Sequence, residues 1–386
     1  MKKIAVLIYS LGAGGAERVV SILLNELKDT ADFTLVLMND TIKYDIPESV
    51  PVVYLERSRV DESGIWKLIK LPFLAYRYKR LCRILGIECS MSFMNRPNYI
   101  NVISKLFGNS VEVMINERAM PSEQYGYGNL LSMINRMMIR RLYPKADQII
   151  SNSFGNARDL KENFAIEKPI FPIYNPCDVR AIQRRMEEPV DFDFTRLTFV
   201  TIGRLDEGKN HKLLIEAMAG LADLETQLII IGEGALRDLL TDQIRYLGLE
   251  KRVFLVGHQK NPYRWLAKSD CFVFASNHEG FPNVLLEALA CGMAIISTDC
   301  PSGPREILAP ASDISSRLYE GVEESEYGVL IPTGKLQPLL DAMVLMSSPQ
   351  KREGFRKQAV KRAYAFEPRG QMEEYKKVLG LETVGR

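Results

Sequence analysis

Two acidic residues in one short segment are the strongest candidates for chemistry in this sequence. Glu279 opens the stretch EGFPNVLLEALACG, and Glu287 follows eight positions later. Pro282 suits the first turn of a helix and Gly292 suits its end, so a helix is expected between them. That helix is apolar except for Asn283 and Glu287, which are four residues apart and share one face. Because a helix that is apolar all round is buried, its carboxylate needs a partner or a ligand.

A structural role is the alternative for both acids. Glu287 would then satisfy a neighbouring basic side chain, and Glu279 would only cap the helix N-terminus, where a carboxylate is favoured.

A basic loop is the second candidate. The segment GRLDEGKNH follows an expected strand, leads into a helix, and carries Arg204 and Lys209. Two cations beside the N–H groups of a helix N-terminus suit a diphosphate. The alternative is a solvent-exposed loop with ordinary surface charges.

Two further segments follow expected strands. GAGGAER contains Gly14 and Gly15, which allow a ligand close to the backbone, and Glu17. Glu17 stands where the dinucleotide-binding pattern has its third glycine, so that pattern is absent. DCPSGPRE offers the backbone N–H groups of Ser302 and Gly303. Each segment is also compatible with a tight turn that binds nothing.

Short apolar strands that alternate with helical patterns must position these segments. Strands are expected at residues 4–9, 33–38, 52–55, 90–93, 111–115 and 148–151, and again at 197–202, 227–231, 253–256, 271–274, 294–297 and 328–331. Fully apolar short strands separated by helices indicate parallel sheets covered on both faces. The pattern occurs twice, which predicts two doubly wound α/β domains with ligands at the carboxyl ends of the strands.

The expected organisation has four parts. They are an N-terminal domain (1–180), a linker (181–195), a C-terminal domain (196–366) and a C-terminal helical segment (367–386) that packs back toward the N-terminal domain. The helix of that last segment is expected at 369–379, after a proline.

Composition excludes several classes of function. The chain has 386 residues, of which 46% are apolar, and this is enough for two cores. A net charge of +2 argues against nucleic-acid binding. No apolar run is long enough for a transmembrane helix, and the short N-terminal run ends in a glycine-rich loop, unlike a signal peptide. The scattered histidines and cysteines predict no metal site and reduced thiols.

Together these segments resemble the family 4 glycosyltransferases, whose GT-B fold has two Rossmann-like domains facing across a cleft. The resemblance covers nearly the whole chain and rests on EGFPNVLLEALACG, GRLDEGKNH and GAGGAER. The stretches KLPFLAYRYKRLCRILGI, NRPNYI and LYPKAD look like the GalNAc transferases of Campylobacter-type N-linked glycosylation. These enzymes extend an undecaprenyl-diphosphate-linked saccharide, here with an α1,4 linkage.

The resemblance implies a retaining transfer from UDP-GalNAc without a metal or other cofactor. Arg204, Lys209 and Glu279 would be the catalytic residues, with the two cations on the diphosphate and Glu279 beside the sugar. Glu287 would bind the ribose. The other donor-site residues that the resemblance implies are Gly14, Gly15, Glu17, Gln259, Gly280, Phe281, Pro282, Asn283 and Val284.

The acceptor side departs from the family pattern. Members often have a histidine after an Asn/Ser–Glu pair, whereas this chain reads Asn116–Glu117–Arg118, and no catalytic histidine is assigned. Residues 64–87 hold six cations, no acid, and interspersed tryptophan and tyrosine, which suits an anionic membrane surface. A surface helix with a solvated basic side is the alternative.

Lys70, Arg77 and Arg80 of this stretch are expected to contact the diphosphate of the lipid acceptor. A second basic stretch lies at 133–145. The expected location is peripheral, at the cytoplasmic face of the bacterial inner membrane. The expected partners are the UDP-sugar, the lipid-linked glycan, the inner leaflet and other enzymes of the pathway, without nucleic acid.

Three alternative functions are weighed. A transferase of the same fold that uses another UDP-HexNAc for capsule or lipopolysaccharide differs in one hydroxyl contact. A UDP-sugar epimerase needs acids and histidines around the pyranose ring, and this chain has only three histidines. An inactive sugar-nucleotide-binding subunit would be expected to lack some of the four charged candidates, all of which are present.

Overall fold

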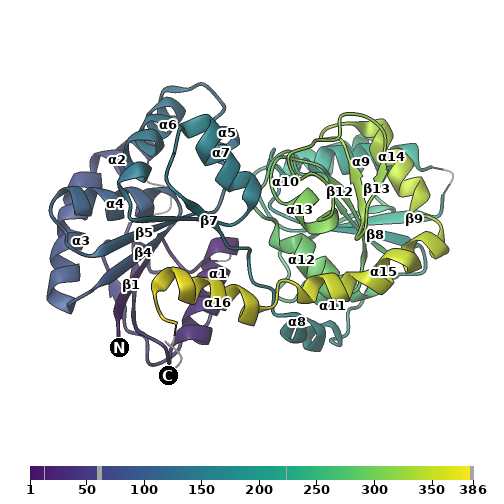
Figure 1. Ribbon diagram of the computed structural model, residues 1–386. Helices are drawn as coiled ribbons and strands as arrows, with labels where there is room; N and C mark the ends of the chain where they lie inside the picture. The colour runs from purple at the N-terminus through teal and green to yellow at the C-terminus, as the bar shows by residue number, and fades with distance from the viewer. Residues whose placement is uncertain (13, 59–62, 223, 383–386) are drawn as a thin grey trace. The chain divides into compact units, whose positions relative to one another are not determined.

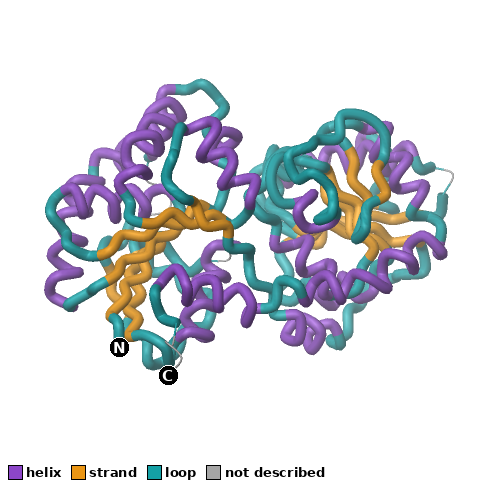
Figure 2. Tube along the Cα trace, in the orientation of Figure 1, coloured by secondary structure: helices purple, strands orange, loops and turns teal. Residues whose placement is uncertain are grey.

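The computed structural model describes residues 1–12, 14–58, 63–222 and 224–382. Its contacts divide the chain into two units: unit 1 contains Met1–Pro176 and the segment from Pro368 onward, and unit 2 contains Cys177–Glu367. In each unit, helices cover both faces of a largely parallel sheet (Figure 1 and Figure 2). This confirms the prediction of two doubly wound α/β folds.

The sheet of unit 1 has the order β3-β2-β1-β4-β5-β6-β7, and all of its strand pairs are parallel. Its strands are β1 (Lys3–Ile8), β2 (Asp32–Leu37), β3 (Val52–Tyr54), β4 (Cys89–Phe93), β5 (Glu112–Glu117), β6 (Gln148–Ser151) and β7 (Ile170–Pro172). The short β7 was not predicted, since three residues that end in proline give little strand signal. The order places β4, rather than β3, beside β1, so a switch point lies between the first and fourth strands.

Helices cover both faces of this sheet. They are α1 (Gly15–Leu27), α2 (Gly64–Ile69), α3 (Leu71–Leu85), α4 (Asn95–Leu106), α5 (Pro121–Gln124), α6 (Leu130–Leu142), α7 (Phe154–Phe164) and α16 (Pro368–Leu379), with a 3-10 turn at Tyr143–Lys145. Alternate residues of β1 serve two cores: Val6 packs with residues of α1 and α16, whereas Leu7 packs with residues of α3 and α4. The period of two along the strand thus supplies both layers.

Unit 2 repeats the architecture with the order β10-β9-β8-β11-β12-β14-β13, in which only β13 is antiparallel among the described strand pairs. Its strands are β8 (Leu197–Ile202), β9 (Thr226–Ile231), β10 (Val253–Gly257), β11 (Cys271–Phe274), β12 (Ala294–Thr298), β13 (Glu323–Glu324) and β14 (Val329–Ile331). Its helices are α8 (Val179–Met186), α9 (His211–Gly220), α10 (Arg237–Tyr246), α11 (Tyr263–Lys268), α12 (Asn283–Ala290), α13 (Pro304–Leu308), α14 (Leu336–Leu345) and α15 (Pro349–Tyr364).

The expected linker 181–195 is more ordered than its polar sequence indicates. Its first residues belong to α8, which packs on α11 and α12, and Ile182 is buried. Phe192 and Phe194 then pack against Trp265, with ring centroids 5.5 and 6.3 Å away. These contacts attach most of the segment to unit 2. A few apolar side chains are enough to fix a segment that is otherwise polar.

The last helix, α16, lies in unit 1 and packs against α1. Its buried residues Met372, Tyr375 and Leu379 recur at helical spacing and join the core on that face of the sheet. Residues 383–386 of the expected C-terminal segment lie outside the described residues. Among the described helices, none has the length and apolar character needed to cross a membrane.

Candidate active site

A cation and a carboxylate meet at the carboxyl edge of the unit 2 sheet. Lys209, in the loop after β8, forms an ion pair with Glu279, in the loop after β11. The two side chains are 23% and 13% exposed, and the Lys209 ammonium lies 5.5 Å from the centroid of the Phe274 ring. Partial burial strengthens this pair relative to a surface pair. The structure thus brings together two of the predicted catalytic residues.

Arg204, from the same loop as Lys209, points into solvent. Its side chain is 82% exposed and its guanidinium lies 3.1 Å from Asp206 Oδ2. Asp206 also accepts a 3.1 Å hydrogen bond from the backbone N–H of Lys209 through Oδ1. Asp206 therefore bonds the guanidinium of Arg204 and the backbone of Lys209. The exposed guanidinium is available to an anionic ligand.

We call residues 203–210, between β8 and α9, the cationic loop. His211, the first residue of α9, fixes the start of this loop. It is buried, and its Nε2 donates to the backbone carbonyl of Arg204 at 3.2 Å, with the proton assigned to Nε2 because a carbonyl can only accept. Burial lowers the pKa of His211 to about 4, so the ring is neutral near pH 7. No sequence pattern distinguishes this histidine from His258 and His278.

Two glycines that were not predicted as functional, Gly232 and Gly234, let the segment after β9 pass close to the cationic loop. A Cβ on Gly232 would lie 1.9 Å from the carbonyl oxygen of Gly203, and a Cβ on Gly234 would lie 2.5 Å from that of Leu205. Any side chain at either position would displace the cationic loop. The segment IGEG directly after β9 was the available signal.

The helix α12 begins at Asn283, and Pro282 is the residue before it, not a first-turn residue as predicted, because its backbone is extended. Gly280, Phe281 and Pro282 are buried, while Asn283 and Val284 are half-buried. The predicted buried carboxylate is present one turn further on. Glu287 is 8% exposed within a helix whose other residues from position 285 to 290 are buried and apolar.

The segment after β12 holds the residues before α12 in place. Ser302 Oγ donates to the carbonyl of Gly280 at 2.6 Å, and a Cβ on Gly303 would lie 2.5 Å from Pro282 Cδ. Gly303 also has a positive φ of 95°. The rigid-turn alternative for this segment therefore describes the observed contacts.

A buried ion pair anchors that turn. Arg305 lies 2.7 Å from Asp299 and 2.9 Å from Glu323, and the Asp299 side chain is fully buried. The paired carboxylates hold the pKa of Arg305 above its usual range although burial opposes this. Because removal of one member would strand a buried charge, this cluster keeps the turn rigid.

Gln259 lies just after β10, at the same edge of the sheet. Its Nε2 donates to the carbonyl of Val256 at 2.7 Å, and its Oε1 accepts from Trp265 Nε1 at 3.3 Å. The side chain that was predicted to bind the donor thus makes hydrogen bonds within unit 2. These bonds fix the loop conformation after β10.

In unit 1 the predicted glycine loop encloses its own carboxylate. Helix α1 begins at Gly15, and a Cβ on Gly14 would lie 2.1 Å from Glu17 Oε2. Burial raises the pKa of Glu17. The Glu17 carboxylate thus lies in the space that a side chain at position 14 would fill, while Ala13 of this loop lies outside the described residues.

The Asn116–Glu117–Arg118 segment, at the end of β5, is built into a buried network. Glu117 accepts a 2.6 Å hydrogen bond from Tyr143 OH and also bonds the backbone N–H groups of Arg118 and Ala119. Burial raises its pKa to about 7. The acceptor-side position where the family often has histidine thus follows an acid that titrates near neutral pH.

Arg118 itself bonds within unit 1. Its guanidinium donates to Tyr375 OH at 3.2 Å and to Asn175, and it lies over the ring of Phe93. Tyr375 belongs to α16, so Arg118 joins the end of β5 to the C-terminal helix. The residue that departs from the family pattern therefore has a structural task.

The basic stretch of unit 1 forms two helices that meet at Lys70. Lys70 lies between α2 and α3 and pairs with Glu56 at 3.1 Å, whereas Arg77 and Arg80 on α3 are exposed. The sequence predicts an apolar side for this stretch that includes Trp66, Leu71, Phe73, Leu74, Tyr78, Leu81 and Leu85. Of these, Leu71, Leu74 and Tyr78 are buried in the core, and Leu81 and Leu85 pack against it partly buried. Trp66 and Phe73, which were predicted on the same apolar side, are exposed, and so are Ile65, Ile69, Tyr76 and Ile84.

Helix α6 extends this exposed apolar surface. A Cβ on Gly64, the first residue of α2, would lie 2.7 Å from Leu131 Cδ2 on α6. Exposed apolar residues of α6 and the loop before it are Tyr127, Leu130, Leu131, Met133 and Met137. Helices α2 and α6 are therefore in contact, and we call the exposed residues of α2, α3 and α6 together the α2/α3/α6 surface.

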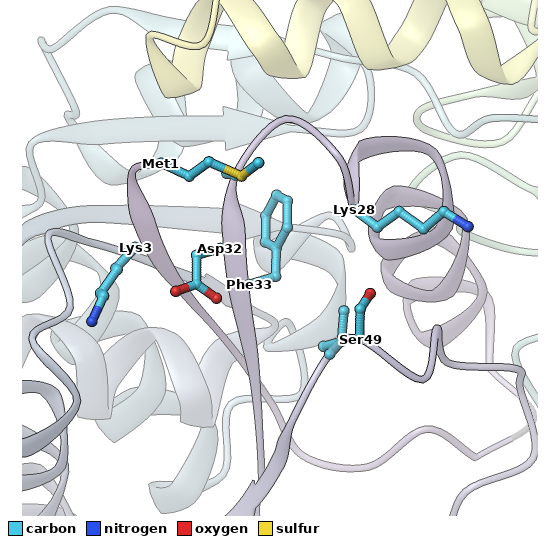
Figure 3. A pocket seen from close by; sticks show the side chains of 8 residues that line it. Met1, Lys3, Lys28, Asp32, Phe33 and Ser49 are labelled. Atoms are coloured by element: carbon cyan, nitrogen blue, oxygen red, sulfur yellow. The ribbon is translucent and has the colours of Figure 1, made fainter.

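One pocket of unit 1 lies at the amino-terminal edge of its sheet, opposite the carboxyl ends of the strands. Figure 3 shows it beside the amino-terminal ends of β1 and β2, lined by Met1, Lys3, Lys28, Ala31, Asp32, Phe33, Ser49 and Val50. Ligands of doubly wound sheets bind at the carboxyl ends of strands, so this hollow is outside the candidate site. No group of three or more potential metal-ligating side chains occurs within the described part of the chain.

Comparison with known proteins identifies relatives over the whole chain. The family described as Glycosyl transferases group 1 matches residues 183–362. The Campylobacter jejuni N-acetylgalactosamine-N,N'-diacetylbacillosaminyl-diphospho-undecaprenol 4-alpha-N-acetylgalactosaminyltransferase is 42% identical over 95% of this chain and 96% of its own length. A second C. jejuni protein, a GalNAc-alpha-(1->4)-GalNAc-alpha-(1->3)-diNAcBac-PP-undecaprenol alpha-1,4-N-acetyl-D-galactosaminyltransferase, is 26% identical over 81% of this chain and 84% of its own length.

Solved structures share the fold at low sequence identity. The sucrose-phosphate synthase of Thermosynechococcus elongatus superimposes with a TM-score of 0.81 at 17% identity, covering 99% of this chain and 100% of that chain. Anabaena HepE in complex with UDP gives 0.74 at 18% identity, covering 98% and 100%. The likeness therefore extends over both units.

Proposed function

Since the chain belongs to the group 1 glycosyltransferases and has the GT-B fold, we propose that it transfers GalNAc from UDP-GalNAc to a saccharide on undecaprenyl diphosphate, in an α1,4 linkage. The observation that carries this proposal is the 42% identity over 95% of the chain to a transferase named for that acceptor and linkage. The intact Arg204, Lys209, Glu279 and Glu287 support an active enzyme.

The donor site of this proposal lies at the carboxyl edge of the unit 2 sheet. Arg204 and Lys209 bind the diphosphate of UDP, and the carboxylate of Glu287 accepts hydrogen bonds from the ribose hydroxyls. Glu279 and the backbone from Gly280 onward lie beside the sugar. The burial of most of α12 and of residues 280–282 fixes Glu287 and the backbone beside the sugar before the substrate arrives, which lowers the ordering cost of catalysis.

The chemical step breaks the bond between the sugar and the diphosphate, and negative charge grows on the leaving UDP. The two cations, of which Lys209 is already held by its ion pair with Glu279, stabilise that charge more in the transition state than in the ground state, and this difference accelerates the reaction. We propose retention of configuration, which the resemblance to the family 4 enzymes implies. We also propose independence from metal ions, because Arg204 and Lys209 supply the two positive charges that a divalent ion would supply.

The acceptor side of the proposal uses the α2/α3/α6 surface. Arg77 and Arg80 are exposed cations beside exposed aromatic and aliphatic side chains, the composition of proteins that bind an anionic bilayer from one side. Lys70, Arg77 and Arg80 then contact the lipid diphosphate, and the enzyme works at the cytoplasmic face of the inner membrane. The ion pair of Lys70 with Glu56 makes Arg77 and Arg80 the stronger contributors.

Mass spectrometry of a lipid-linked acceptor after incubation with UDP-GalNAc, and separately with UDP-GlcNAc, tests the function. A mass increase of one N-acetylhexosamine with UDP-GalNAc alone is the expected result. Transfer with UDP-GlcNAc instead would favour a capsule or lipopolysaccharide enzyme. An epimerised UDP-sugar with unchanged acceptor would identify an epimerase, and the absence of UDP release would identify an inactive subunit.

A further inference from the structure

One asparagine fastens the loop after β8 to the loop after β11. Asn277 Nδ2 donates to the carbonyl of Glu207 at 2.9 Å, and its backbone N–H donates to the carbonyl of Gly208 at 2.8 Å. Its Oδ1 accepts from Asn210 Nδ2 at 3.3 Å. Three hydrogen bonds from one residue thus span four consecutive positions of the cationic loop.

The two residues next to these bonds are the ones that form the ion pair. Lys209 directly follows Gly208, and Glu279 lies two positions after Asn277. A lysine side chain has four rotatable bonds, so its ammonium is well placed only when the backbone beneath it is fixed. The Asn277 bonds fix that backbone relative to the backbone of Glu279.

Two other side chains bond the backbone of the cationic loop, but neither connects it to the loop after β11. His211 holds the carbonyl of Arg204, at the beginning of the loop, and Asp206 holds the N–H of Lys209 from inside the loop. Both fix the shape of the loop itself. Asn277 is different because it fixes the distance from this loop to the loop that carries Glu279.

We propose that Asn277 is a positioning residue, which holds Lys209 and Glu279 at a fixed separation on either side of the diphosphate–sugar bond. This inference rests on the proposed function for the chemistry of that bond. Asn277 acts through the two charged residues and does not touch the reacting atoms. A displacement of about 1 Å at such a site can cost about 100-fold in rate.

The test compares Asn277→Ala with a matched asparagine elsewhere in unit 2. Asn261 also bonds two backbone groups, donating to Arg185 O at 2.7 Å and accepting from Tyr263 N–H at 3.2 Å, and it is buried. Asn277→Ala should lower kcat by about 10- to 100-fold while the Kd for UDP changes by less than about three-fold. Asn261→Ala should retain kcat although each variant loses two side-chain hydrogen bonds, those of Asn277 being with the carbonyl of Glu207 and with Asn210 Nδ2.

A double variant separates positioning from general destabilisation. In a Lys209→Ala background the group to be positioned is gone, so Asn277→Ala should lower kcat little further, by less than about three-fold. If Asn277→Ala lowers kcat by the same factor in both backgrounds, the positioning role is overturned.

Hydrogen exchange tests the inference without transferase activity. Amides of residues 205–210 should exchange about ten-fold faster in Asn277→Ala than in the wild type, and at the wild-type rate in Asn261→Ala. Absence of GalNAc transfer by the wild type would reject the proposed function alone. Unchanged exchange of this loop in Asn277→Ala, or an unchanged kcat in an active enzyme, would reject the role of Asn277.

Discussion

Lys209 and Glu279 form an ion pair although seventy residues separate them in the sequence. They meet because β8 and β11 are adjacent parallel strands, so the loops that follow them emerge side by side at one edge of the sheet. The pairing has a functional consequence under the proposed mechanism. The ammonium of Lys209 is shared between a fixed carboxylate and the diphosphate of the donor, and Glu279 therefore affects both binding and chemistry.

Replacement of Glu279 by Gln should separate these two effects. We expect kcat to fall by about 100-fold because the carboxylate beside the sugar is lost, and UDP affinity to rise a few-fold because Lys209 no longer has a competing anion. Calorimetry with UDP and a UDP-release assay measure the two quantities. Glu324→Gln, which disrupts an exposed pair with Lys351, is the control and should change neither. A parallel loss of affinity and kcat would contradict the assignment.

Arg204→Ala should reduce activity without affecting folding. The guanidinium is largely exposed, so its removal creates no cavity, whereas the transition state loses one of two cations on the leaving group. By analogy with loss of an oxyanion donor, the barrier should rise by about 2–4 kcal/mol. Steady-state kcat/KM and the thermal unfolding midpoint provide the measurements. Arg245→Ala, another exposed and ion-paired arginine of unit 2, should leave both unchanged. Activity close to wild type in Arg204→Ala would remove it from the diphosphate site.

Chelation should leave the enzyme active. Arg204 and Lys209 supply the positive charge on the diphosphate, so we expect nearly full turnover in excess EDTA. The rate should be compared before and after extensive dialysis against EDTA, and again after addition of magnesium or manganese. An absolute requirement for either ion would show that the two cations are insufficient and would reject the metal-free mechanism.

Neutralising the basic helix should affect the lipid substrate only. The triple variant Lys70→Gln, Arg77→Gln and Arg80→Gln should bind anionic liposomes more weakly, by about 1 kcal/mol for each exposed cation, and should have a higher KM for the lipid acceptor. Liposome sedimentation and acceptor titration are the measurements, with UDP affinity expected to stay constant. The charge-matched control replaces three exposed lysines of unit 2 by Gln, namely Lys335, Lys357 and Lys361. Equal liposome binding by both triple variants would return α3 to a solvated surface helix.

Glu117 should make the stability of unit 1 depend on pH. Burial raises its pKa to about 7, above the ordinary 4.5, so the folded protein binds more protons than the unfolded chain between these values. Stability contributed by the protonated form is therefore complete below pH 4.5 and is lost as the pH rises to 7. The loss is at most about 3.5 kcal/mol, since one pKa unit corresponds to about 1.4 kcal/mol.

The free energy of unfolding of the wild type and of Glu117→Gln should be measured at about pH 5, 6, 7 and 8, which covers the range in which Glu117 titrates. The stability of the wild type relative to Glu117→Gln should decrease from pH 5 to pH 7 and then level off. Glu26→Gln, at an exposed site on α1, should instead follow the wild type at each pH. A constant difference between the wild type and Glu117→Gln would mean that Glu117 does not titrate in this range.

Local sequence was sufficient to predict most of the helices and strands and to single out the candidate donor-site residues. Short apolar runs predicted most of the strands within a residue or two, because burial on both faces imposes a local pattern. The isolated Glu287 in an apolar helix was recognisable for the same reason, since hydrophobicity and helical period are properties of neighbouring residues. Elements that were not predicted, such as β7 and α8, are stabilised by a few contacts with distant residues and have no strong strand or helix pattern of their own.

Only the tertiary structure decided which side chains meet. Strand order brings β8 beside β11, and this order, which does not follow the chain, creates the Lys209–Glu279 pair and the Asn277 bonds. The same holds for the contact of the Glu17 carboxylate with Gly14 and for the hydrogen bond from Ser302 Oγ to the carbonyl of Gly280. These contacts join residues far apart or depend on the exact path of the backbone, so no periodicity encodes them. The sequence by itself determined which charged groups follow the strands, and the non-consecutive strand order determined which of them lie close together.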